Sequence, residues 1–221
     1  MTASGVRTGI EDLCRAHQGS GRAALGRLLG GMEEIASEGA WVVVADGRRF
    51  LNFGGHGVYL LGHRHPEVTA AVHRQIDTHP MSTRVFFEPA GVHAAAALSA
   101  VTPAGLDLVH FVNSGAEATE AALKLARAHG KTEIVTTVNG FHGKTLGALS
   151  VTARPVFQRP FEPLLPGVTA VRYGDAAELD AALARVAGRG VLIVEPVQGE
   201  GGVIVPPPGY LAAAADLCRQ H

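Results

Sequence analysis

The stretch Asn113–Glu117, with the sequence NSGAE, could bind an anion. It lies between an apolar run at 108–112 and a segment of helical periodicity that ends near Gly130. Ser114 and Glu117 have the spacing of a capping box, which marks the first turn of a helix. Free backbone N–H groups and the helix dipole converge there, so such a turn suits a phosphate or carboxylate. An ordinary, well-capped turn would have the same residues, and a short glycine motif alone does not decide between the two.

A second loop, 139–145, has the sequence NGFHGKT and combines an aromatic ring, an imidazole and a cation. Phe141 offers a face on which a planar ring could stack. His142 could form a polar wall, and Lys144 could meet an anion. Each residue also has an ordinary alternative, namely a core aromatic, a structural histidine and a solvated lysine.

A third loop, 195–202, has the sequence EPVQGEGG and follows the apolar run 191–194. Glu195 and Glu200 place two carboxylates directly after a strand of buried type, which is costly unless they are paired or functional. The glycine-rich context favours a site over a surface turn.

An alternation of strands and helices positions these loops. The expected strands are 108–112, 133–138, 168–172 and 191–194, and the expected helices are 115–129 and 177–187. This order indicates an α/β fold with a mainly parallel sheet and helices on both faces. Ligand sites in such folds lie beyond the carboxyl ends of the strands, where all three loops fall. On the helix 115–129, Glu120 stands four residues before Lys124, which is the spacing of a surface pair.

The first part of the chain has a different pattern. Short strands are expected at 32–37, 40–45 and 49–53, with a hairpin at Asp46-Gly47, and helices at 10–17, 22–29 and 88–101 and from Pro66. These strands predict a small antiparallel sheet. His56, His63 and His65 lie within ten residues, but no cysteine or carboxylate joins them at ligand spacing, so no metal site is expected.

The composition argues against several classes of function. A net charge of −1, 18% charged residues and no basic block disfavour nucleic acid or an anionic membrane as a partner. No apolar stretch has the length of a membrane span, and the N-terminus lacks the apolar core of a signal peptide. Cys14 and Cys218 have no metal-type spacing and are expected to be free thiols. The predicted location is the cytoplasm.

Three ordered stretches carry a family resemblance: NSGAEATEAALKLAR, FHGKTLGALS and VEPVQGEGGVIVPPPGYL. They resemble the class III aminotransferases, which are pyridoxal-5′-phosphate (PLP) enzymes of fold type I. LGHRHPEV, FQRPFEPLLPG and Arg84 within STRVFF support the resemblance. It implies an N-terminal segment at 1–65 with the antiparallel sheet, and the first part of the large PLP-binding domain at 66–221.

The resemblance also implies roles for individual residues. The cofactor-binding residues would be those of the phosphate cup, the stacking ring and their neighbours, namely Ser114, Gly115, Ala116, Phe141, His142 and Glu195. The substrate-binding residues would be Arg84, Lys144 and Glu200. Members that use amino acids often have an arginine at the Lys144 position. Lysine there, with PLLPG and PPPGYL, resembles putrescine aminotransferases, although lysine still binds an anion as a point charge.

A second departure concerns the catalytic lysine. The family has a buried Asp-Glu-x-Gln strand, followed by the Schiff-base lysine, beyond the point where this 221-residue chain ends. None of its three lysines, Lys124, Lys131 and Lys144, matches that lysine. We therefore expect a fold that is incomplete at the C-terminus, with no catalytic residue in the chain, which would be a fragment or one half of a split enzyme.

The complete enzyme would transfer an amino group from an amine, diamine or ω-amino acid to a 2-oxo acid or aldehyde. It would be a homodimer, or a heteromer with a chain that carries the missing half. The isolated chain would expose apolar surface and associate, and a monodisperse, cooperatively folding monomer would contradict this. Alternatives are an aminomutase or a decarboxylating transaminase of the same fold, or a non-catalytic protein that binds a ligand or a partner.

Overall fold

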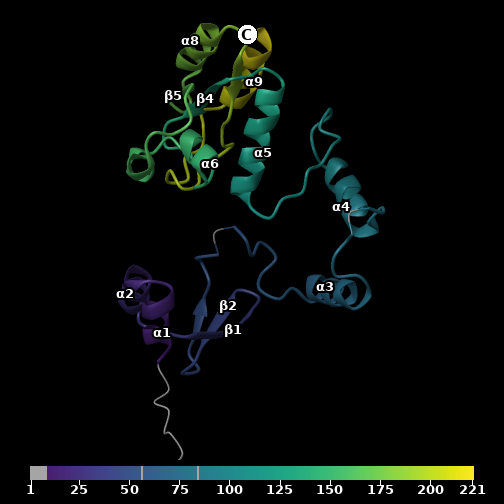
Figure 1. Cartoon of the computed structure of the whole chain (residues 1–221), viewed down its shortest axis with the longest axis vertical. Coiled ribbons are helices and arrows are strands. Elements are labelled where there is room, and N and C mark those ends of the chain that lie inside the picture. Colours follow the sequence, from purple (N-terminus) through teal and green to yellow (C-terminus); the bar gives the residue numbers. More distant parts are fainter. Residues whose placement is uncertain (1–8, 56, 84) are drawn as a thin grey trace, which may run out of the picture. The chain divides into compact units, whose positions relative to one another are not determined.

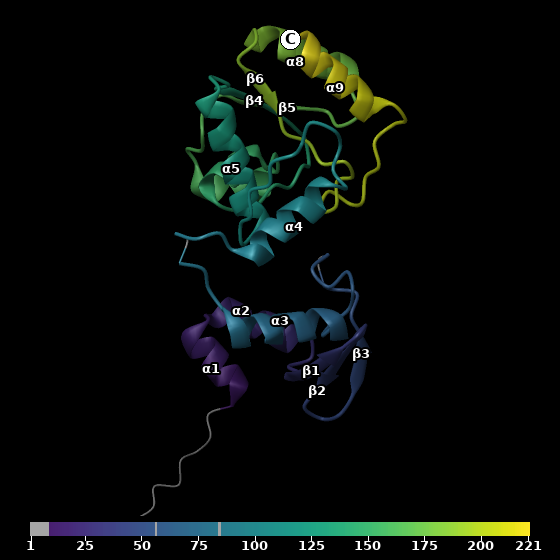
Figure 2. The same cartoon turned by 90° about the vertical axis from the view of Figure 1, so that its right-hand side faces the viewer.

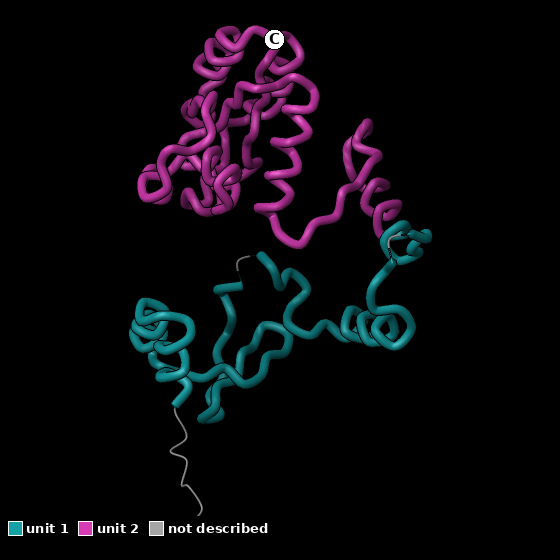
Figure 3. The backbone as a smooth tube through the Cα atoms, in the orientation of Figure 1, with its two compact units in different colours: residues 1–93 teal, residues 94–221 magenta. Residues whose placement is uncertain are grey.

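The computed structural model describes residues 9–55, 57–83 and 85–221 (Figure 1). The chain divides into two compact units, residues 1–93 and 94–221 (Figure 3). The boundary falls inside helix α4 (Pro89–Ser99). This division rests on compactness and does not test the segments 1–65 and 66–221 that the family resemblance implies. That division stays a prediction.

The first unit contains the predicted antiparallel sheet. It begins with two helices, α1 (Ile10–His17) and α2 (Ser20–Leu28). Strands β1 (Glu34–Glu38), β2 (Trp41–Val44) and β3 (Arg49–Leu51) then pair in sequence order, with each neighbour antiparallel. Gly47, at φ +87°, makes the expected turn between β2 and β3. Helix α3 (Pro66–Thr78) starts at the proline that the sequence indicates.

The second unit contains a three-stranded parallel sheet in the order β5-β4-β6. Ile134 of the central strand lies opposite Val168 on one side and Val191 on the other. The elements of this unit, in chain order, are α5 (Gly115–Ala128), β4 (Glu133–Thr137), α6 (Leu146–Val151), α7 (Pro155–Gln158), the 3₁₀ helix η1 (Arg159–Phe161), β5 (Val168–Val171), α8 (Ala176–Val186), β6 (Gly190–Leu192) and α9 (Tyr210–Gln220).

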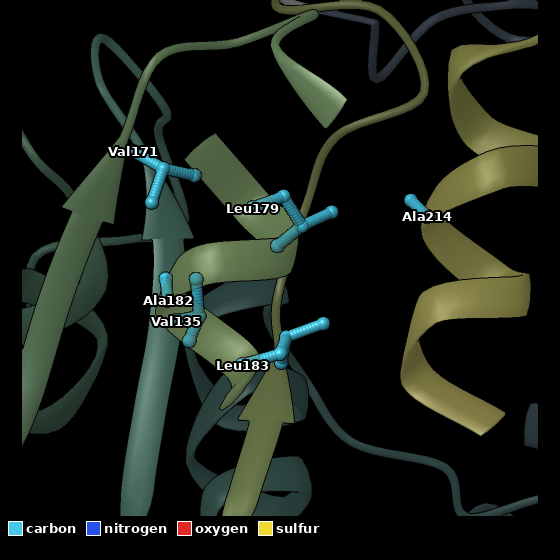
Figure 4. Close-up of a cluster of buried hydrophobic side chains, with 6 residues drawn as sticks. All are labelled: Val135, Val171, Leu179, Ala182, Leu183 and Ala214. Carbon is cyan, nitrogen blue, oxygen red and sulfur yellow. The ribbon is translucent and has the colours of Figure 1, made fainter. Parts of the chain in front are cut away.

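Helices cover both faces of this sheet (Figure 2). On one face, Val135 of β4 packs with Leu179 and Leu183 of α8 and with Ala214 of α9 (Figure 4). On the other face, a second cluster consists of Leu123 of α5, Ile134 of β4 and Val151 of α6. Successive residues of one strand thus point into opposite cores, as the alternation of a strand requires. The α/β fold with a parallel sheet between helices is confirmed.

The predicted strand at 108–112 is wrong. This segment precedes α5 in an irregular conformation, and its side chains are largely solvent-exposed, with Leu108 at 97% and Phe111 at 54%. A strand needs a neighbour that takes up its backbone N–H and C=O groups. No described residue pairs with this segment, so its apolar sequence alone does not make it a strand.

Within the described residues, no helix combines the length and the apolar character needed to cross a membrane.

Candidate functional site

The first turn of α5 presents free backbone donors. The Ser114 hydroxyl accepts a hydrogen bond from the Glu117 N–H at 3.2 Å, and the Glu117 carboxylate accepts one from the Asn113 N–H at 2.8 Å. These contacts satisfy the predicted cap. Among the described residues, none accepts a hydrogen bond from the N–H groups of Gly115 and Ala116. Both donors stand at the positive end of a 14-residue helix, where an anion is favoured.

The loop 139–145 packs directly against this turn. Gly143 has φ +127°, and a Cβ atom at this position would lie 2.8 Å from the Ala116 Cβ. Thr119 of α5 donates from Oγ1 to the His142 carbonyl at 2.9 Å. Only a glycine fits between the loop and the helix, so Gly143 brings the predicted aromatic loop next to the free donors.

Buried threonine hydroxyls hold His142. Its N–H donates to Thr152 Oγ1 at 2.9 Å, and its ring Nε2 lies 3.5 Å from Thr136 Oγ1. Both threonines are fully buried. Burial lowers the pKa of His142, and the negative charge of Glu195 offsets part of this shift. His142 is therefore a neutral, oriented imidazole at neutral pH.

Glu195 joins the second loop to the third. Its carboxylate accepts from the Phe141 N–H at 2.9 Å through Oε2 and from the Gly199 N–H at 3.3 Å through Oε1. Tyr173, in the loop after β5, lies with its hydroxyl 3.0 Å from the Glu195 carbonyl and 2.9 Å from the Pro196 carbonyl. Glu195 thus supports the backbone behind the Phe141 ring.

Gln198 is a structural anchor that the sequence did not reveal. Its side chain is 1% exposed and donates from Nε2 to Thr137 Oγ1 at 3.1 Å and to the Val138 carbonyl at 2.8 Å. It attaches the third loop to the end of β4. An amide in a glycine-rich loop reads as exposed, and nothing in the local sequence indicates that it is buried.

The predicted surface pair between Glu120 and Lys124 is wrong. The Glu120 carboxylate instead accepts from Thr145 Oγ1 at 2.6 Å, from the Gly147 N–H at 3.0 Å and from the Ala148 N–H at 3.3 Å. Glu120 therefore caps helix α6 from a neighbouring helix. Three free donors at a helix start bind a carboxylate more strongly than one exposed ammonium does.

Two cations and two aromatic rings stand together at the end of the second loop. The rings of Phe141 and Phe157 meet edge to face at 6.4 Å between centroids. Lys144 Nζ lies 5.8 Å from the Phe141 centroid and 5.0 Å from that of Phe157, while the Arg154 guanidinium lies 4.8 Å from the latter. These distances are those of cation–π contacts. Phe157 and Arg154 were not among the predicted site residues. Phe157 begins the stretch FQRPFEPLLPG, which supports the family resemblance, whereas Arg154 lies outside it.

The structure thus brings the predicted residues of all three loops to one end of the parallel sheet. Glu200, the last of them, is exposed and lies with its carboxylate 4.0 Å from the Arg154 guanidinium. Arg84 is outside the described residues, so its role stays a prediction. No described group of three or more histidine, cysteine, aspartate or glutamate side chains is arranged to hold a metal ion.

Residues 33–221 match the sequence profile of the aminotransferase class-III family. The chain belongs to this family. Among solved structures, a similar fold is found in an (S)-enantioselective ω-transaminase from Thermomicrobium roseum, at 29% identity and a TM-score of 0.81, over 90% of this chain and 51% of that one.

Two further solved structures resemble this chain. The ornithine aminotransferase from Toxoplasma gondii is 28% identical with a TM-score of 0.76, over 97% of this chain and 55% of that one. An engineered ω-transaminase from Pseudomonas jessenii is 26% identical with a TM-score of 0.82, over 96% and 54%. The chain spans about half the length of these proteins.

The cofactor of class III aminotransferases is PLP, and one solved relative, an amine transaminase from an uncultivated Pseudomonas species, is a PLP-bound form. This chain has features that fit this group. The N–H donors of Gly115 and Ala116, which have no acceptor among the described residues, suit its phosphate, and the Phe141 face suits its ring. A side chain at position 143 would collide with Ala116 beside these donors.

Proposed function

We propose that this protein acts as a PLP-dependent aminotransferase on small molecules. It moves an amino group from an amine, diamine or ω-amino acid to a 2-oxo acid or aldehyde. This proposal is carried by the N–H groups of Gly115 and Ala116, for which the described part of the chain offers no acceptor, with the Phe141 loop packed against them through Gly143. An anion site and an aromatic face side by side suit a phosphorylated, planar cofactor.

The phosphate is bound by the first turn of α5. The N–H groups of Gly115 and Ala116 donate to it, and the helix dipole favours its negative charge. The Ser114 hydroxyl accepts a hydrogen bond from the Glu117 N–H and donates its own proton to the Glu117 carboxylate. When the hydroxyl turns away from that carboxylate, it can donate the proton to the phosphate. Because most of these donors belong to the backbone, the binding depends on the path of the chain.

The ring of the cofactor is held by the second loop. Phe141 stacks on one face, and Glu195 fixes the backbone of Phe141 from behind. His142, kept neutral by burial, adds a polar edge without adding a positive charge. When bound, PLP supplies the electron-withdrawing ring on which amino-group transfer depends.

The lysine that binds the cofactor covalently is proposed to lie outside these 221 residues, in a longer chain or in a partner. Lys124 lies on α5, Lys131 donates from Nζ to the Gly188 carbonyl at 2.5 Å, and Lys144 lies over two aromatic rings. We therefore propose that the active form is a homodimer of a longer chain or a heteromer, with residues 66–221 as the first part of its large domain.

Trapping of the cofactor tests this function. The protein is incubated with PLP and reduced with borohydride, with and without any polypeptide encoded directly downstream, and the labelled lysine is located by mass spectrometry. We expect PLP to bind and to be trapped on a lysine other than these three. Binding without trapping in either sample would indicate a non-catalytic binding protein, and absence of binding would refute the PLP site.

A further inference from the structure

Glu120, in the second turn of α5, joins this helix to the end of the second loop. Its carboxylate accepts three hydrogen bonds at the same oxygen, Oε1. The donors are Thr145 Oγ1 at 2.6 Å, the Gly147 N–H at 3.0 Å and the Ala148 N–H at 3.3 Å. Thr145 is the last residue of the loop that carries Phe141, and the two N–H groups belong to α6. Glu120 therefore holds both the end of this loop and the start of the helix that follows it.

The approach of Glu120 to α6 leaves no room for a side chain at Gly147. A Cβ atom at this position would collide with Glu120 Oε2 and would lie 2.7 Å from Oε1. Gly147 lies inside α6 and is not among the glycines with positive φ, so its backbone does not require a glycine. A glycine inside a helix lowers stability relative to alanine. The close approach of the carboxylate is thus the feature that requires glycine here.

Two further contacts join the same face of α5 to the second loop. Ala116 packs closely against Gly143, and Thr119 donates from Oγ1 to the His142 carbonyl at 2.9 Å. Ala116, Thr119 and Glu120 have the spacing of neighbours on one helix face. The helix that is proposed to bind the phosphate and the loop that is proposed to bind the ring are therefore joined over the first two turns of α5.

We propose that Glu120 is a positioning residue, which fixes the distance between the N–H donors at the start of α5 and the Phe141 ring. This proposal rests on the proposed aminotransferase function. A ligand that carries a phosphate and a planar ring contacts both halves of the site at once, and it binds more tightly if their distance is already fixed before it arrives. Inorganic phosphate contacts only one half, so its affinity should depend little on Glu120.

The test compares inorganic phosphate with 4-deoxypyridoxine 5′-phosphate in the intact protein, by isothermal titration calorimetry. This PLP analogue has a methyl group in place of the aldehyde, so its binding needs no lysine. Glu120→Ala is expected to weaken binding of the analogue roughly tenfold, as for the loss of one hydrogen bond to a charged group, and that of phosphate by less than about twofold. Glu120→Gln keeps an oxygen that can accept at the same place and is expected to bind the analogue within about threefold of wild type.

A substitution that leaves Glu120 in place tests the same contact from the other side. Gly147→Ala should displace the carboxylate and weaken binding of the analogue as Glu120→Ala does, although alanine favours the helix. In the Glu120→Ala background, Gly147→Ala should have no further effect, because the carboxylate that it displaces is gone. Asp180→Ala, which removes a contact between α8 and His221, is the matched control and is expected to change neither affinity.

The outcomes separate this role from the proposed function. The role of Glu120 would be overturned, with the aminotransferase function left standing, by equal weakening of both ligands in Glu120→Ala or by unchanged binding of the analogue. Additive effects in the double variant, or a Glu120→Gln variant as weak as Glu120→Ala, would overturn it as well. If the wild-type protein bound neither ligand and borohydride trapped no PLP, the proposed function would be overturned, and the role of Glu120 with it.

Discussion

The two compact units differ sharply in how well they bury their apolar side chains. In the described part of the chain, twelve of the fourteen buried hydrophobic residues belong to the second unit, and only Ala23 and Val44 belong to the first. In the first unit, Phe53, Leu60 and Phe87 are 93%, 86% and 98% exposed. Apolar exposure on this scale is unusual for a free surface.

This difference means that the second unit is stabilised by its own hydrophobic core, whereas the first unit is not. The second unit has a core on each face of its sheet, and the loops of the candidate site extend from that sheet. The first unit has a sheet with sparse packing behind it. The candidate site is therefore built on the part of the chain that has its own core.

The largest effect is expected from a core truncation. Leu179→Ala removes a fully buried side chain from the cluster of α8, β4 and β5 and is expected to lower the free energy of unfolding by about 2–5 kcal/mol. Leu60→Ala is the matched change in the first unit and is expected to cost less than about 0.5 kcal/mol. Urea unfolding followed by circular dichroism measures both. Similar losses in the two variants would break the contrast between the units.

An intermediate effect is expected at Gly143. Gly143→Ala combines left-handed backbone strain with a contact against Ala116 and is expected to cost about 2–4 kcal/mol and to weaken PLP binding. Gly47→Ala, in the hairpin of the first unit, has positive φ but open space around its Cβ and is expected to cost about 1–2 kcal/mol. Fluorescence titration with PLP measures the binding. If both variants bound PLP like wild type, the close approach of loop and helix would not matter for the site.

The smallest effect is a change in pH dependence at His142. Burial lowers the pKa of this imidazole, so the folded protein binds fewer protons than the unfolded chain once the pH falls below about 6.5. Well above pH 6.5, the lowered pKa of His142 has no effect on the free energy of unfolding. As the pH falls from about 6.5 to the lowered pKa, it destabilises the fold increasingly. Unfolding in urea at pH 7.5 and 5.5 should show a smaller loss of stability on acidification in His142→Gln than in wild type. An unchanged difference would show that His142 is not held neutral by the fold.

Local signals predicted most elements of both units. Helix α1 has the predicted bounds, and the cap at Ser114 forms as the spacing of Ser114 and Glu117 indicates. Helix bounds and caps depend on residues only a few positions apart, so they can be predicted from a short stretch of sequence. The apolar run 108–112 shows the limit, because its conformation depends on a neighbouring strand that the run itself does not specify.

The site was predicted where its residues lie in motifs, and missed where they act through distant contacts. Phe141 and Glu195 stand out by type and position, but that Glu195 supports the Phe141 backbone, 54 residues away, is visible only in the fold. Glu120, Gln198 and Arg154 were missed for the same reason. Each has its partners on another loop, helix or strand.

The main-chain donors at Gly115 and Ala116 affect which amino-acid substitutions such a protein tolerates during evolution. No replacement of a side chain removes a main-chain N–H, unless the replacement is proline. Residues at these two positions can therefore vary in type while the anion site persists. The substitutions that abolish anion binding should instead be those at neighbouring residues that shape the backbone, such as Gly143. A survey of tolerated substitutions would then find many residue types at positions 115 and 116, which bind the anion, and few at position 143, which shapes the backbone around them.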